Sequence, residues 1–197
     1  MLRSVCRVSH PSFLPLMTTL SPRLFRFFLS ILFIVLTGIA TARAEEINPP
    51  FGLRWGETAE RMERLLLGAK ATIVDRRLID GREAWDVEGL IQTGLKRTVF
   101  YFQHAQLVEV ELQYQKADWN DEQYDNFMGD VRKRLEQKYG EGQLVAKRTE
   151  QEPSTDIMKK IVGYKWNQNN TAIELVYFAA TNASKAFRTL SVHYKTY

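Results

Sequence analysis

The sequence predicts an α+β fold made of two tandem units. Each unit has one helix followed by four antiparallel strands, and the helices pack on one face of the sheet. Three observations support this prediction. Apolar residues recur at helical spacing in two segments, alternating segments follow each of them, and turn residues separate the segments. A helix must cover its apolar stripe, and an antiparallel sheet offers one apolar face for that purpose.

The first predicted helix follows the segment FGLRWGE at residues 51–57. Thr58 is a suitable N-cap, and Gly68 is suited to a left-handed stop. The spacing i, i+3, i+4 of its apolar residues indicates one buried helical face. The residues of this stripe are Met62, Leu65 and Leu66.

Four strands are predicted after this helix, and Asp80-Gly81 is a strong signal for a two-residue hairpin between the first two. In the last of the four, apolar residues at 108, 110, 112 and 114 alternate with polar residues at 109, 111 and 113. Such alternation indicates a strand with one core face and one solvated face. The four candidates are residues 71–79, 82–90, 96–102 and 107–115.

The second half repeats this order. Asn120 and Gln123 form a capping-box pattern, and Trp119 can pack on Tyr124 as a hydrophobic staple. Pro153 predicts that the chain leaves the sheet between residues 150 and 156. The helical stripe consists of Tyr124, Phe127, Met128, Val131 and Leu135, and the strand candidates are residues 143–149, 161–168, 171–179 and 187–197. Residues 45–197 are therefore predicted to be a single domain of two similar halves, at about 50–116 and 117–197.

Residues 1–44 have the features of a secretory signal peptide. Arg23 and Arg26 precede a 14-residue apolar run, Phe27–Ala40, and Ala42-Arg43-Ala44 follows it. A membrane-spanning helix needs about 20 residues, so the run is short for one. We predict cleavage before Glu45 and a periplasmic or secreted mature protein. Met17 is a possible alternative start, and an uncleaved anchor is the alternative interpretation.

The predicted cleavage changes the charge and removes the only cysteine. Five of the 27 basic residues lie in residues 1–44, which contain no acids, so the mature chain has 22 basic and 23 acidic residues. A net charge of −1 gives little counterion release on nucleic acid, and nucleic-acid partners are not expected. Cys6 leaves with the leader, which excludes disulfides, thiolate nucleophiles and cysteine metal sites in the mature chain.

Few residues of the mature chain form a catalytic pattern. His104 and His193 each stand alone, without the spacing that a zinc site needs, and no serine lies in a G-x-S-x-G elbow. A serine–histidine–acid triad could still assemble through the fold. The acidic pairs at 86 and 88 and at 109 and 111 could serve acid–base chemistry or calcium binding, or form the solvated side of a sheet. We expect no cofactor and no metal.

The segment FGLRWGETAERMERLLLG at residues 51–68, with the doubled order of elements, resembles small exported bacterial proteins with the tandem-repeat fold of the β-lactamase inhibitory protein and related outer-membrane assembly lipoproteins. The chain lacks the inhibitor's disulfides and the lipoproteins' acylated cysteine. The resemblance implies a binding scaffold that uses a concave sheet face.

The sequence therefore predicts an exported, non-enzymatic interaction module with a protein or envelope partner. Its working surface would be the sheet face opposite the helices, acidic in the first half and basic in the second. The alternatives are a small envelope hydrolase, in which a histidine meets these acids, and a lipid or ligand carrier. The four tryptophans fit either core corners or interface hot spots. The predicted partner-binding residues are Asp86, Glu88, Glu109, Glu111, Lys165 and His193.

Overall fold

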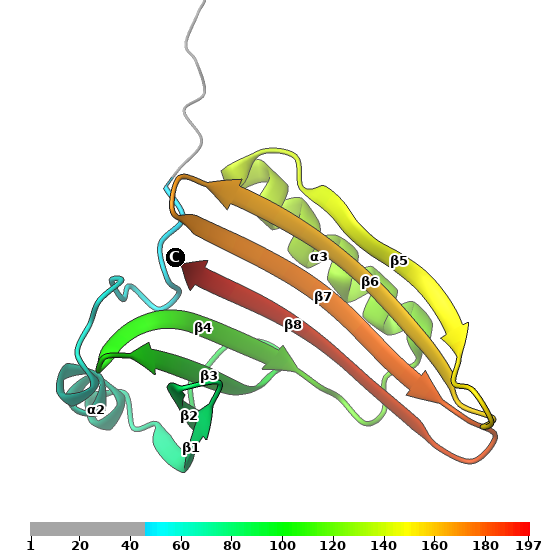
Figure 1. Cartoon of the computed structure of the whole chain (residues 1–197), viewed down its shortest axis with the longest axis horizontal. Helices are drawn as coiled ribbons and strands as arrows, with labels where there is room; N and C mark the ends of the chain where they lie inside the picture. The colour runs from blue at the N-terminus through cyan, green and yellow to red at the C-terminus, as the bar shows by residue number, and fades with distance from the viewer. Residues whose placement is uncertain (1–45) are drawn as a thin grey trace, which may run out of the picture. The chain divides into compact units, whose positions relative to one another are not determined.

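The structure, a computed structural model, describes residues 46–197. The predicted signal peptide and its cleavage site lie outside the described residues, as does the alternative of an uncleaved anchor. The described elements run in the order α2, β1–β4, α3, β5–β8 (Figure 1). The helices are α2 (Ala59–Gly68) and α3 (Asp121–Tyr139), and the strands are β1 (Thr72–Ile79), β2 (Arg82–Glu88), β3 (Leu95–Gln103), β4 (Gln106–Tyr114), β5 (Gln143–Gln151), β6 (Met158–Gln168), β7 (Thr171–Thr181) and β8 (Ala186–Thr196).

All eight strands belong to one antiparallel sheet in the order β1-β2-β3-β4-β8-β7-β6-β5. At its centre β4 pairs with β8, from Glu109 opposite Lys195 to Tyr114 opposite Leu190. The two helices make up only 19% of the described residues. The predicted fold class, two tandem helix-plus-four-strand units with the helices packed on one face, is therefore wrong. The molecule is mainly one eight-stranded sheet, because pairing β4 with β8 satisfies two strand edges that separate units would leave exposed.

The local signals placed the ends of the elements well. The Thr58 side chain caps α2 by accepting from the Arg61 N–H, and Asn120 and Gln123 form the predicted capping box of α3. Asp80 and Gly81 both have positive φ, at 49° and 76°, as a type I′ hairpin requires. The left-handed stop predicted at Gly68 instead lies at Lys70, with φ 58°.

One face of the sheet, here called the α3 face, contacts α3. Arg188 of β8 pairs with Asp121, Lys160 of β6 pairs with Asp125 at 3.1 Å, and the Tyr164 hydroxyl accepts from Arg132 at 2.7 Å. Figure 1 shows α3 running along β5, β6 and β7, behind them in this view. Helix α2 contributes only Met62 and Leu66 to the core, and Leu65, predicted to be buried, is exposed.

The core lies on the α3 face and is rich in aromatic residues. Trp85 and Trp166 are buried there, which favours the core interpretation of these two tryptophans over an interface role. The Trp166 indole N–H donates to the Gly140 carbonyl at 2.8 Å, and Trp85 donates to Glu83 at 2.7 Å. Large buried members of this core are Trp85, Phe100, Phe102, Leu107, Tyr124, Ile173, Leu175, Tyr177 and Leu190.

The strand β4 departs from the predicted alternation at its start. The pairing register shifts between Tyr101 and Phe102 of β3, so Leu107 enters the main core. Val108, predicted to point into that core, packs instead with Val99 and Tyr101 on the opposite side of the sheet. From Glu109 onward the alternation follows the prediction, with Val110, Leu112 and Tyr114 in the core.

Candidate functional site

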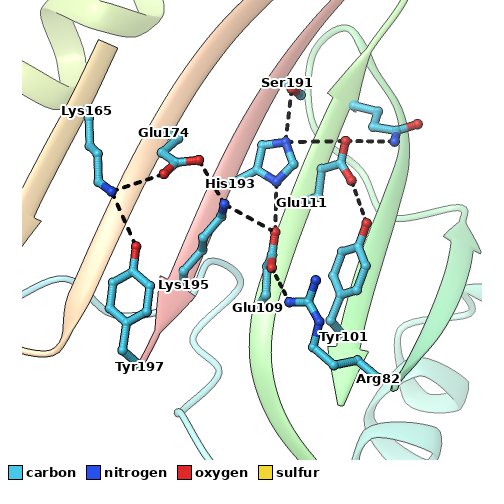
Figure 2. Close-up of polar contacts among 11 residues, drawn as sticks. Arg82, Tyr101, Glu109, Glu111, Lys165, Glu174, Ser191, His193, Lys195 and Tyr197 are labelled. Carbon is cyan, nitrogen blue, oxygen red and sulfur yellow. Dashed lines mark hydrogen bonds and ion pairs between the residues drawn. The ribbon is translucent and has the colours of Figure 1, made fainter. Parts of the chain in front are cut away.

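A continuous network of polar side chains covers part of the sheet face opposite the α3 face, here called the open face. It links strands β1 to β4 and β6 to β8, and Figure 2 shows its central part. Register explains the assembly: Glu111 of β4 lies opposite His193 of β8, which lies opposite Glu174 of β7. Residues that face each other across paired strands point to the same side of a sheet.

At the centre of the network His193 lies between two carboxylates (Figure 2). Its Nδ1 is 2.9 Å from Glu109 Oε1, and its Nε2 is 3.5 Å from Glu111 Oε1. Arg82 donates to the other oxygen of Glu109 at 2.7 Å. Burial works to raise the pKa of Glu109, but the hydrogen bonds from His193 and Arg82 outweigh it and hold that pKa below its usual value. Glu109 is therefore a buried, charged acceptor.

Glu111 is held from its other side by two neutral donors. The Tyr101 hydroxyl donates to Glu111 Oε2 at 3.0 Å, and the Gln113 amide donates to Oε1 at 2.8 Å. Burial, together with the negative charge of Glu111, raises the pKa of Tyr101, so the phenol keeps its proton. The guanidinium of Arg82 also stacks 4.9 Å from the Tyr101 ring centroid.

The network extends to Asp86 through arginines. Arg97 donates to the Gln113 amide oxygen at 2.8 Å and to Asp86 Oδ2 at 2.9 Å. Arg77 of β1 reaches the same Asp86 oxygen at 2.6 Å. Two guanidinium groups thus neutralise one carboxylate that is removed from water.

In the other direction the network reaches β6 and the last residue of the chain. Lys195 bridges Glu109, at 3.9 Å, and Glu174, at 2.8 Å. Lys165 pairs with Glu174 at 3.3 Å and with the Tyr197 hydroxyl at 3.4 Å. Burial works to raise the pKa of Glu174, and the hydrogen bond and charge of Lys195 with those of Lys165 lower it below its usual value.

The structure brings five of the six predicted site residues into this network. Arg97 and Gln113 connect Asp86 to Glu111. His193 connects Glu111 to Glu109. Lys195 and Glu174 then connect Glu109 to Lys165. Glu88 is exposed at the end of β2, opposite Thr72 of the edge strand β1.

The predicted exposure of these acids is wrong. The side chains of Asp86 and Glu109 are only 3% and 8% exposed, whereas those of Arg97 and Arg82 are 39% and 30% exposed. The arginine heads lie outside the carboxylates, so the first half of the open face is not the acidic surface that alternation predicted. Ser191, on the same face, is also buried.

Sequence reasoning missed the residues that neutralise the acids. They are the cations Arg77, Arg82 and Arg97; the neutral donor Tyr101 and the further acid Glu174 were also missed. A usable signal existed, because each lies on a strand at the alternation phase of a polar face. The pairs themselves depend on which strands are neighbours, and β4–β8 pairing joins residues more than 80 positions apart, such as Glu109 and His193.

Ser191, His193 and Glu109 occur in the order of a serine–histidine–carboxylate triad. The Ser191 hydroxyl is 3.2 Å from His193 Nε2, and His193 Nδ1 is 2.9 Å from Glu109. Acyl transfer also needs N–H groups directed at the developing oxyanion. Strand β8 pairs with β4 and β7 on both sides from Leu190 to Lys195, so its N–H groups there belong to the sheet ladder. The N–H groups of β8 beside Ser191 are therefore not available to a developing oxyanion.

The described residues contain no cluster of three or more histidine, cysteine or acidic side chains with the geometry of a metal site. In the same part of the chain, no helix has the length and apolar character required to span a membrane. Comparison with protein-family models, with curated proteins and with solved structures finds no match for this chain. The resemblance of residues 51–68 to exported binding scaffolds stays a prediction.

Proposed function

We propose that this protein is an exported, non-enzymatic interaction module that binds a protein partner on the open face. The observation that carries the proposal is an aromatic pair on the same face of the sheet as the polar network. Phe178 of β7 and Phe187 of β8 have ring centroids 6.2 Å apart, and Phe187 is 49% exposed. Alternation along β8 places Phe187 and Thr189 on the same side as Ser191, which is the open face. Phe178 of β7 pairs with Thr189 and therefore lies on that side as well.

A half-exposed aromatic pair on a face that also carries arginines and lysines has the composition of an interface centre and its rim. The network supports this use of the face because its charged groups are fixed before a partner arrives. Ordered side chains lose less entropy on binding. The exposed heads of Arg82 and Arg97 favour a partner with an acidic surface, since complementary charge raises association rates and selects partners. Export to the periplasm or outside the cell rests on the predicted leader.

The test is a pull-down from cell-envelope extract with purified protein as bait. We expect Phe187→Ala to weaken capture of a specific partner, because truncation of a central aromatic residue commonly costs more than about 1 kcal/mol of binding energy. Leu67→Ala, on the exposed side of α2, is the matched control and should capture as wild type does. Equal capture by both variants, with both folded, would remove the open face as the binding surface.

A hydrolase is the alternative proposal, supported by the triad order of Ser191, His193 and Glu109. It makes a separate expectation: the protein would cleave an activated ester, and Ser191→Ala would abolish the cleavage. Under the interaction proposal, wild type and Ser191→Ala give the same background rate.

A further inference from the structure

A groove of about 760 Å³ lies on the α3 face, over the seam where β4 pairs with β8. Its volume is within the range of small-molecule sites, about 300–1,000 Å³. We call it the seam groove. Strand residues form its floor and α3 forms one wall. Its apolar and aromatic lining includes Leu112, Tyr114, Val192 and Tyr194 from the strands and Val131 and Leu135 from α3.

Two tyrosine hydroxyls in the seam groove lack protein partners. Tyr114 is only 3% exposed, yet within residues 46–197 neither its hydroxyl nor that of Tyr194 makes a hydrogen bond. Among the described residues, three side-chain atoms are sealed from solvent without a partner, and neither hydroxyl is one of them, so both are accessible to solvent. Such hydroxyls bond to water, and a ligand with an acceptor atom can take the place of that water.

Both hydroxyls are donors. Burial raises the pKa of Tyr114 to about 12 and also raises that of Tyr194, so each phenol keeps its proton at neutral pH. Arg134 lines the same groove as these two tyrosines. A neutral phenol can donate a hydrogen bond to an anion, and it carries no negative charge that would repel the anion.

The rim of the groove carries two cations without acidic partners. Arg134 donates from Nε to the Asp130 carbonyl of its own helix at 3.3 Å. In the described part of the chain, neither Lys133 nor Arg134 forms an ion pair with a carboxylate, although Asp130 also lines the groove. An arginine with free donors beside two phenols can hold a carboxylate by charge-assisted hydrogen bonds.

We propose that the seam groove binds an amphipathic carboxylate, with an unbranched acyl chain on the floor of Leu112 and Val192. Arg134 holds the carboxylate, and the hydroxyls of Tyr114 and Tyr194 are additional donors. The site goes beyond the proposed function, because it lies on the opposite side of the sheet from the open face.

The experiment is calorimetric titration with decanoate and with decanol. The protein is expressed from the full-length sequence and purified as the host cell processes it. The two probes share one apolar chain and differ in charge. We expect decanoate to bind saturably, and decanol to bind at least about tenfold more weakly, since a hydrogen bond to a charged group contributes about 1.5–3 kcal/mol.

Variants assign the binding to the groove. Arg134→Gln should weaken decanoate binding about tenfold or more and leave decanol unchanged, and Tyr114→Phe should weaken decanoate binding several-fold. Arg64→Gln is the matched control, because Arg64 is exposed on α2 and lines no part of the groove. Circular dichroism checks that each variant is folded.

Three results would overturn the proposal. They are the absence of saturable decanoate binding, equal affinity for decanol, and decanoate binding that Arg134→Gln leaves unchanged. None of them bears on the open face, where Phe187→Ala tests the proposed function, so the two proposals fail separately.

Discussion

Glu109 lies on a central strand and yet keeps its charge away from water. Arg82, His193 and Lys195 all approach this one carboxylate, at 2.7, 2.9 and 3.9 Å. A buried charge is tolerated only when paired and hydrogen-bonded, and removal of one partner leaves the others uncompensated. The charge reversal of Glu109 and Glu111 to lysine, which strand alternation alone presents as a mild surface change, should therefore destabilise the fold.

Glu109→Gln is the sharper test at this scale. The neutral amide keeps the volume but loses the charge that Arg82 and His193 need, so we expect the free energy of unfolding at neutral pH to fall by about 1–3 kcal/mol. Urea unfolding measures it. Glu88→Gln is the control, because Glu88 is exposed, and it should change stability by less than about 0.5 kcal/mol. Equal stability of both variants would show that the network does not support the fold.

The same network makes stability depend on pH. Folding lowers the pKa values of the network residues Glu109 and Glu174 below their usual value of 4.5, and it lowers that of Asp121, at the start of α3, below 3.8. A carboxyl with a lowered folded pKa contributes stability above its unfolded pKa and loses it as pH falls through the folded value. We expect the free energy of unfolding to decline as pH falls below about 4.5, and Glu109→Gln to show a smaller decline. Identical declines would contradict this role of Glu109.

At the scale of elements, α3 shows which part of a helical pattern predicts burial. Tyr124, Met128, Val131 and Leu135 are buried, and Phe127 is partly buried at the edge of the stripe. In α2 the stripe is displaced: Met62 and Leu66 are buried, but Leu65 is exposed. The sheet lies along a long stretch of α3 and meets the shorter α2 only over a narrow strip, so the width of the buried stripe depends on the partner surface.

Leu135→Ala should lower the free energy of unfolding by about 2–5 kcal/mol, because it leaves a cavity between α3 and the sheet. Leu65→Ala makes the same chemical change at a position that is 41% exposed and should cost less. Urea unfolding followed by circular dichroism compares the two. Similar losses for both variants would mean that α3 is not packed against the sheet as described.

At the scale of the whole molecule, the pairing of β4 with β8 joins the halves into one sheet. The core runs across this seam, since Leu112 and Val192 face each other in the pairing and belong to the same buried cluster. Strand edges, core and polar network are thus shared between residues that lie far apart in the chain. Such sharing favours a single cooperative unfolding transition.

We predict coincident urea transitions for the two halves. Trp85 reports on the first half and Trp166 on the second, and both are buried. Two variants isolate these fluorescence probes: each keeps either Trp85 or Trp166 and has the other three of the four tryptophans replaced by phenylalanine. The remaining fluorescence transition in each folded variant should coincide with its transition by circular dichroism. Separate midpoints for the two probes would show that the halves unfold independently.

The sequence by itself determined the local structure. Capping residues, Asp80-Gly81 and strand alternation act over a few neighbours, so they located the helices, the strands and the polar side of β4. Tertiary structure alone decided that β4 pairs with β8, and with it the single sheet, the burial of Glu109 by Arg82 and His193, and the seam groove. Alternation gives the face of each side chain but not its neighbour on the next strand, and burial and charge pairing depend on that neighbour.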